Sequence, residues 1–238
     1  MNPLDQHQVE IQKNFAAWQQ KPLLQDIYNG FYKSILSLID PETPGHVIEV
    51  GSGIGNLKQH LPKAITTDLF PNPWLDLVCD AYHLPFRDNS VSHLVLFDVF
   101  HHLRYPAAFL KEARRVLNGP LIIFEPFISW TSFPIYGLFH HEPVGWRDPI
   151  DFSDRPSETN YYAAQGNATR LFFKGKVDGW RVLHAEAFSA FHYLMSGGFS
   201  KPALYPRSLL KSVRVLDSVL TRWPRLFGGR CLIALEQA

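Results

Sequence analysis

The chain has 238 residues, of which 46% are hydrophobic and 19% are charged, and its formal net charge is +1. This composition excludes a disordered or collagen-like chain and predicts a globular protein with a substantial core. A near-neutral charge provides no electrostatic basis for wrapping nucleic acid, so we expect no nucleic-acid partner. One α/β domain is favoured over two full domains, since single cores grow until roughly 250–300 residues.

The cysteines and the first residues bear on cellular location. Cys79 and Cys231 each lie in an apolar stretch, which is typical of small core residues and not of a disulfide or a metal pair. The N-terminal residues lack a basic segment followed by an apolar one, so we expect no signal peptide. No uncharged run reaches the ~18–20 apolar residues of a membrane span. The sequence therefore favours a cytoplasmic protein.

Residues 1–40 are predicted to form one or two lead-in helices. Apolar side chains recur there every three to four residues, from Leu24 to Ile39, until Pro41 interrupts the pattern. Short β-branched runs follow and predict buried parallel strands at 46–50, 64–69, 75–79, 93–99 and 121–125. Between these strands, 56–61 predicts a short helix and 106–117 a longer one, as in right-handed crossovers.

The second half of the chain begins with a segment of different character. From 127 to 178 the periodicity fails and prolines alternate with aromatic residues, and so long an insertion is usually functional or else disordered. Two further strands are predicted at 180–188 and 230–236. Between them a helix is predicted whose buried apolar stripe is Leu209, Val213, Leu216 and Leu220. Its opposite face carries Arg207, Lys211 and Arg214.

A glycine-rich motif follows the first predicted strand. From Val47 to Asn56 the sequence VIEVGSGIGN combines a strand, an acidic residue and alternate glycines. Glycines at a strand-to-helix turn let backbone N–H groups approach a ligand. In the dinucleotide motif G-x-G-x-x-G the third glycine comes three residues after the second, whereas Gly55 follows Gly53 by two. Glu49 also suits a cationic ligand better than a pyrophosphate, so a nicotinamide-dependent oxidoreductase is disfavoured.

Four carboxylates lie at the ends of four successive predicted strands: Glu49, Asp68, Asp80 and Asp98. Open α/β sheets bind ligands at the carboxyl ends of their strands, so we expect all four to face one crevice. Asp68 stands 19 residues after Glu49, where a carboxylate in such folds binds ribose hydroxyls. Any single Asp could instead cap a helix or a turn. Four in register indicate a ligand site.

Together these motifs resemble the class I S-adenosylmethionine-dependent methyltransferases, in particular the methyltransferase type 11 group. The resemblance covers roughly residues 45–126, with a looser similarity through the last two strands. The residues that resemble the family's first motif are Glu49, Gly51, Ser52, Gly53 and Gly55. Asp68, followed by Leu69, resembles the ribose-binding acid, and Asp80-Ala81 the pair that contacts adenine. The segment from Leu84 to Val95 resembles the link into the fourth strand, which Asp98 follows.

The resemblance implies a cofactor and a fold. The cofactor is S-adenosylmethionine, with S-adenosylhomocysteine as product, and these motif residues together with Asp98 are expected to bind it. The fold is a Rossmann-like, doubly wound α/β sheet of seven mostly parallel strands whose last strand is antiparallel. Residues 1–40 form its helical N-terminal lead-in, and residues 41–238 are the methyltransferase domain, with an aromatic-rich substrate-cap insertion after strand five at about 127–178.

Methyl transfer from a sulfonium is an in-line displacement that needs few catalytic side chains beyond those that align the reactants. A hydroxyl acceptor benefits from a general base, and His102, then His101, are the candidates because they follow Asp98 directly. Either histidine could instead pack under the cofactor or bond the backbone. With His140, His141 and Glu142 they could supply a metal site, but adjacent histidines in an extended segment point to opposite sides, so we expect no metal.

The acceptor is inferred from the aromatic insertion. Candidate substrate-binding residues are Trp130, Tyr136, His140 and His141. Aromatic side chains there suit a small-molecule or lipid-like acceptor, methylated at oxygen, although they could simply pack a subdomain. The segment after the fourth strand lacks the Asn/Asp-Pro-Pro-Tyr/Phe sequence of enzymes that methylate amines of bases.

Two further hypotheses concern partners. From 199 to 238 there are seven Lys or Arg against two Asp or Glu, and a basic amphipathic helix can make peripheral membrane contact. Such a helix can also be an ordinary solvated face. The alternative to an enzyme is a non-catalytic partner or scaffold protein of the same fold that binds the cofactor, since methyl transfer requires no diagnostic catalytic residue.

Overall fold

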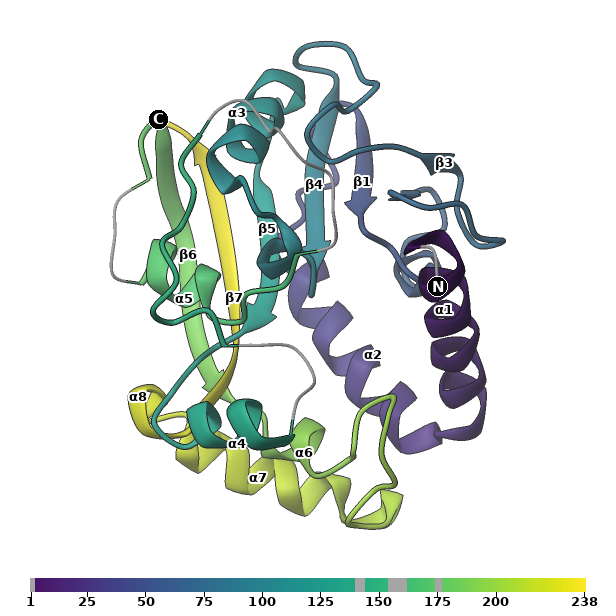
Figure 1. Ribbon diagram of the computed structural model, residues 1–238, viewed down its shortest axis with the longest axis vertical. Coiled ribbons are helices and arrows are strands. Elements are labelled where there is room, and N and C mark those ends of the chain that lie inside the picture. Colours follow the sequence, from purple (N-terminus) through teal and green to yellow (C-terminus); the bar gives the residue numbers. More distant parts are fainter. Residues whose placement is uncertain (1–2, 140–143, 154–161, 174–176) are drawn as a thin grey trace.

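The computed structural model describes residues 3–139, 144–153, 162–173 and 177–238 (Figure 1). Its centre is a seven-stranded sheet in the order β3-β2-β1-β4-β5-β7-β6. The strands are β1 (His46–Val50), β2 (Ile65–Asp68), β3 (Leu77–Val78), β4 (Val91–Phe97), β5 (Leu121–Pro126), β6 (Trp180–Ser189) and β7 (Gly228–Gln237). The first five are parallel, and β7 lies antiparallel between β5 and β6. The predicted α/β class and the antiparallel last strand are confirmed.

Eight α-helices occur in the described ranges: α1 (Pro3–Gln20), α2 (Pro22–Leu36), α3 (Pro106–Val116), α4 (Ser132–Phe139), α5 (Asn167–Phe172), α6 (Phe191–Leu194), α7 (Leu210–Leu220) and α8 (Pro224–Phe227). Three short 3-10 helices join them: η1 (Asn56–Gln59), η2 (Phe100–His102) and η3 (Arg207–Leu209). Figure 1 shows α4, α6, α7 and α8 gathered beyond the carboxyl ends of β5 and β6. No helix in these ranges combines the length and the apolar character that a membrane span requires.

Strand side chains alternate between two hydrophobic layers, one on each face of the sheet. On one face, Leu94 and Leu96 of β4 belong to the core that includes Phe109 of α3. On the other, Val95 and Phe97 belong to the core that includes Phe31 of α2. Because successive residues of a strand point to opposite faces, continuous apolar runs are required where both faces are covered.

Three elements differ from the predicted ranges. The fourth strand spans 91–97 instead of 93–99, because Asp98 takes a left-handed conformation (φ +57°) that ends it. The third strand is reduced to Leu77–Val78. The segment predicted as helix 56–61 forms only a 3-10 turn, since it is confined between left-handed Gly55 and Pro62.

The orientation of α7 differs from the predicted one. Leu209 and Leu216, expected to be buried, are 48% and 50% exposed, whereas Leu210 and Asp217 are buried. The Asp217 carboxylate accepts hydrogen bonds from the backbone N–H groups of Phe191 (2.8 Å) and His192 (2.9 Å) at the start of α6. It also accepts bonds from Ser189 Oγ and His192 Nδ1, both at 2.5 Å. Four polar contacts to one buried carboxylate therefore set the rotation of the helix.

Candidate active site

The glycine-rich motif forms a tight loop between β1 and η1. Gly51, Gly53 and Gly55 all have positive φ, at +70°, +53° and +68°. At Gly51 a Cβ atom would also lie 2.4 Å from Cγ2 of Val99, so a side chain is excluded by space as well as by backbone conformation. Ser52 ties this loop to β2, because its N–H donates to the Thr67 carbonyl at 2.8 Å and its Oγ accepts from the Thr67 N–H at 3.0 Å.

Glu49 is a buried carboxylate at the base of this loop. The residue is 1% exposed, and burial raises the pKa of its carboxyl to about 8, although hydrogen bonds from Ser52 and Tyr32 act against that shift. Within the described residues its Oε2 atom has no hydrogen-bond partner. A buried acceptor without a partner has a high desolvation cost, which a cationic group of a ligand would relieve. The site thus fits the ammonium end of S-adenosylmethionine.

Asp68 and Asp80 follow the two neighbouring strands. Asp68 Oδ2 accepts a hydrogen bond from the Gly53 N–H at 3.1 Å, so the second strand is linked directly to the glycine loop. Asp80 Oδ1 accepts from the Tyr82 N–H at 2.9 Å, which is a turn-forming contact. Leu69 is 41% exposed and Ala81 is half-buried. The strand order places all four predicted carboxylates along one edge of the sheet.

Asp98 differs from the other three, because it is paired with a cation that the sequence analysis did not identify. It forms an ion pair with Arg230 of β7, which is 2% exposed. The guanidinium also lies 4.4 Å from the ring centroid of Tyr193 and 5.8 Å from that of Phe124. Burial raises the pKa of Asp98, and the positive charge of Arg230 opposes this shift. Arg230 directly precedes the apolar run 231–235 of β7, which is the sequence signal that could have found it.

His101 forms a buried dyad with Glu125, a second residue that the sequence analysis missed. His101 Nδ1 lies 2.7 Å from Glu125 Oε2, and both side chains are at most 3% exposed. The other carboxylate oxygen accepts from the Phe100 N–H at 2.6 Å. Because a carboxylate only accepts, this contact assigns the proton of the neutral imidazole to Nδ1 and leaves Nε2 as the basic nitrogen. Glu125 is the only charged residue of β5, which was the available signal.

His102 is held separately from His101, although their ring centroids are 4.1 Å apart. Its Nδ1 lies 3.0 Å from the carbonyl oxygen of Tyr162, so its neutral form also presents Nε2 as the base. Each histidine therefore makes a structural hydrogen bond through its Nδ1, as the sequence allowed. In the described residues no group of three His, Cys, Asp or Glu side chains is arranged to hold a metal ion.

The four predicted acceptor-binding residues have different outcomes. His140 and His141 lie outside the described residues. Tyr136 is buried, and its hydroxyl pKa is raised by burial and lowered by the charge of Arg230. Trp130 is 80% exposed, so the structure places it at the surface and not in a cavity. The backbone N–H of Trp130 donates to the Arg225 carbonyl of α8 at 3.0 Å, so the chain at this residue lies on α8.

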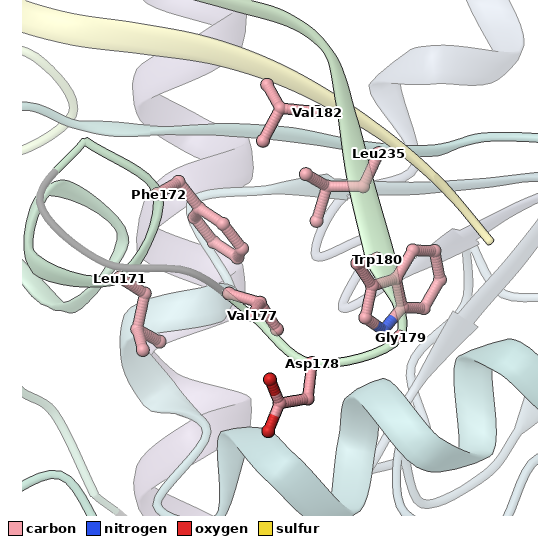
Figure 2. Close-up of a pocket in the computed structure, with 8 residues that line it drawn as sticks. All are labelled: Leu171, Phe172, Val177, Asp178, Gly179, Trp180, Val182 and Leu235. Atoms are coloured by element: carbon pink, nitrogen blue, oxygen red, sulfur yellow. The ribbon is translucent and has the colours of Figure 1, made fainter. Parts of the chain in front are cut away.

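A cavity of about 330 Å³ lies away from these residues. It is lined by α5, the start of β6 and the end of β7, and Figure 2 shows Phe172 and Val177 facing Leu235 and Trp180 across it. Leu235 pairs with Leu121, the first residue of β5. The cavity is therefore at the amino ends of the parallel strands, opposite the carboxylate row.

The sheet has the Rossmann-like fold of the class I methyltransferases, and comparisons with known proteins agree. Residues 48–122 match the model of a methyltransferase domain family. No curated protein matches the sequence. The match and the fold confirm the predicted class, a class I S-adenosylmethionine-dependent methyltransferase domain, and its methyl donor S-adenosylmethionine.

Solved structures with low sequence identity share this fold. A Haloferax volcanii chain described as a methyltransferase, solved with the Trm112 methyltransferase activator, is 17% identical at a TM-score of 0.56, covering 99% of this chain and 96% of its own. A Haemonchus contortus phosphoethanolamine N-methyltransferase is 14% identical (TM-score 0.53, 87% and 52% coverage). Geranyl diphosphate C-methyltransferase from Streptomyces coelicolor is 11% identical (TM-score 0.51, 88% and 78% coverage). At these identities the likeness concerns the fold alone.

Proposed function

We propose that this protein transfers the methyl group of S-adenosylmethionine to a hydroxyl oxygen of a small, apolar or lipid-like acceptor. The observation that carries this proposal is the buried His101–Glu125 dyad, which lies at the carboxyl ends of β4 and β5. β4 lies between β5 and β1, and the end of β1 carries Glu49. A base and a cofactor cradle thus lie at the same edge of the sheet.

The cofactor, when bound, supplies an electrophilic methyl group on a sulfonium. In our proposal Glu49 faces its ammonium group, for which the unpartnered Oε2 atom is the support. Asp68 accepts the ribose hydroxyls, and Leu69 and the Asp80-Ala81 pair flank the adenine. Gly53 leaves room for such a ligand, because a Cβ atom there would meet only Ile11, at 3.9 Å.

His101 acts as the general base in the proposed reaction. Its Nε2 takes the hydroxyl proton as the acceptor oxygen bonds to the methyl carbon and the carbon–sulfur bond breaks. Glu125 holds the ring and stabilises the imidazolium that forms, as a carboxylate does in other His–acid pairs. His102 is the second candidate for this role, since it presents the same nitrogen.

The acceptor class is supported by aromatic side chains at the same edge of the sheet as the dyad. The guanidinium of Arg230 lies over the rings of Phe31, Phe124 and Tyr193. Such surroundings exclude water and favour an apolar acceptor body. Phosphorylated and prenylated small molecules are named with the Haemonchus and Streptomyces proteins of this fold, which is consistent with a small-molecule acceptor here.

The first test is calorimetry of the purified protein with S-adenosylmethionine, S-adenosylhomocysteine and NADH. We expect both sulfur ligands to bind and NADH not to bind. Asp68→Ala is expected to weaken binding by about 1–3 kcal/mol, the usual loss for a buried hydrogen-bonded partner. Asp148→Ala, at an exposed carboxylate, is the matched control. Equal affinities of the two variants would contradict the ribose assignment.

The second test is methyl transfer from labelled cofactor to a panel of alcohols, phenols, amines and a total lipid extract. Glu125→Gln is expected to lower kcat and to shift its pH profile without changing cofactor affinity, whereas His46→Ala, at an exposed histidine, should match the wild type. Transfer to amines alone would overturn the role of the base. Cofactor binding with no transfer to any acceptor would favour the partner or scaffold protein.

A further inference from the structure

Exposed apolar side chains are concentrated at one end of the molecule. Among the described residues, ten of the sixteen large apolar side chains that are exposed lie within 130–133 and 194–226. The most exposed include Trp130 (80%), Val215 (65%) and Trp223 (51%). Most isolated exposed apolar residues need no explanation, but a contiguous group indicates an interaction surface.

These segments are joined into one surface. The N–H groups of Trp130 and Thr131 donate to the carbonyls of Arg225 and Leu226, at 3.0 and 3.1 Å, so the chain before α4 lies directly on α8. Figure 1 shows α4, α7 and α8 at the same end of the molecule. We call this surface, formed by Trp130, α7 and the segment 222–226, the α7–α8 face.

The rotation of α7 determines which side chains this face presents. Because Leu210 and Asp217 point inward, the outward side of the helix carries Lys211, Val215 and Val219, and Arg222 follows two residues after its end. All four are exposed. Basic and apolar side chains are thus exposed together along one side of α7 and the residues that follow it.

The charge of this face has a single sign. Segments 127–139 and 190–229 contain one carboxylate, Asp217, which is buried and fully engaged with α6. Arg207 and Arg214 are bonded to Asp26 of α2. The side chains of Lys211, Arg222 and Arg225 make no hydrogen bond or ion pair with any described residue. Three such cations beside exposed Trp and Leu side chains are complementary to a surface that is both apolar and anionic.

We propose that the α7–α8 face docks on an anionic lipid bilayer, with Trp130, Trp223 and Leu226 inserted at headgroup depth and Lys211, Arg222 and Arg225 among the lipid phosphates. The sequence suggested membrane contact through a basic helix face that carries Arg207, Lys211 and Arg214. Because Arg207 and Arg214 are bonded to α2, Arg222 and Arg225 take their place in this proposal. A planar bilayer offers apolar and anionic groups together over the whole face, which a small ligand does not.

Docking in this orientation also bears on the acceptor, and this step rests on the proposed function. A groove between α4, α6 and α8, lined by Ile135, Tyr136, Tyr193, Leu194 and Gly228, lies at the same end of the molecule. Tyr193 contacts Arg230, the partner of Asp98. The groove therefore lies next to the Arg230–Asp98 pair, at the end of the molecule where an acceptor dissolved in the membrane would approach the docked protein.

The test is sedimentation of the full chain with vesicles of phosphatidylcholine alone or with 30% phosphatidylserine, at low and high salt. We expect binding only to the anionic vesicles and a loss at high salt. Arg222→Glu/Arg225→Glu should weaken binding at least about 25-fold, since each basic side chain near such a surface contributes about fivefold. Lys63→Glu/Arg87→Glu changes the net charge equally at exposed sites elsewhere and should bind as the wild type does.

A second measurement reports insertion and guards against misfolded variants. Brominated lipids should quench tryptophan fluorescence in the wild type and less in Trp130→Ser/Trp223→Ser, whereas Phe152→Ser, at another exposed aromatic, should sediment unchanged. Three outcomes would overturn the proposal: no sedimentation at low salt, equal binding to neutral vesicles, or an equal loss of binding in both charge variants. A protein partner would then be the better occupant of this face. Cofactor titration separates this result from the proposed function: vesicle binding without cofactor binding would refute only the latter.

Discussion

The ion pair between Asp98 and Arg230 permits a sharp test of how burial controls the energy of charge pairs. Asp98 has φ +57°, a conformation that asparagine tolerates, so Asp98→Asn removes the charge with little backbone strain. The guanidinium left behind is 2% exposed and cannot be hydrated. By contrast, the carboxylate left in Arg230→Met is 27% exposed and can recruit water. We therefore expect Asp98→Asn to be the more destabilising change.

The magnitude follows from the surroundings of Arg230. Removing one partner of a buried pair costs about 3–5 kcal/mol because it leaves an uncompensated charge. The aromatic contacts to Tyr193, Phe124 and Phe31 remain in the variant and stabilise the cation, so the loss should lie near the lower end, at about 3 kcal/mol. For a chain of this size that corresponds to a decrease in Tm of roughly 6–12 °C.

Urea unfolding of the ligand-free protein measures this loss. The matched control is Asp26→Asn, which breaks the exposed pair with Arg207 and should cost less than about 1 kcal/mol. The double variant Asp98→Asn/Arg230→Met should recover most of the stability, since no charge is then left buried. A loss for Asp98→Asn no larger than that for Asp26→Asn, or no recovery in the double variant, would refute the reasoning.

Two further predictions concern the glycine loop. The raised pKa of Glu49, about 8, means that its carboxyl is protonated at pH 7 in the free protein. An ammonium group beside it should lower that pKa, so cofactor binding at pH 7 should release about one proton. Calorimetry in buffers of different ionisation enthalpy should show this proton release in the wild type and not in Glu49→Gln. The pKa of Glu49 in the folded protein lies above its ordinary value of 4.5. The stability that Glu49 contributes is therefore complete below pH 4.5 and is lost as the pH rises through about 8. An identical pH dependence of unfolding in the wild type and in Glu49→Gln would contradict this. Gly51→Ala should destabilise the fold by about 1–2 kcal/mol through its positive φ and by a further ~1–3 kcal/mol through the clash with Val99. Adding Val99→Ala should restore only the second part in urea unfolding, and an unchanged double variant would show that the clash is relieved in another way.

Sequence patterns predicted the elements of this fold because those patterns are local. Continuous apolar runs such as 121–124 require two covered faces, and a parallel sheet places the ends of such strands at one edge. The positions of Glu49, Asp68, Asp80 and Asp98 along that edge followed from the order of the strands. The glycine spacing separated the motif from the dinucleotide type, and the fold and the family match agree with that distinction.

Element boundaries were less predictable where the backbone departs from regular geometry. The left-handed conformation of Asp98 shortened the fourth strand, and nothing in the local pattern distinguishes such a residue from a strand residue. Similarly, the apolar stripe of 209–220 predicted a helix correctly but not its rotation. A buried Asp217 that accepts bonds from α6 outweighs the burial of Leu209 and Leu216.

The sequence by itself thus determined the class of fold, the cofactor motif and the edge of the sheet where chemistry occurs, since each depends on residues close together in the chain. Only the tertiary structure decided the partners of the polar side chains. Asp98 and Arg230 are 132 residues apart, and His101 meets Glu125 across two neighbouring strands. Which charge neutralises another, and which apolar side chain remains exposed, depends on packing between distant segments, and no local periodicity records that packing.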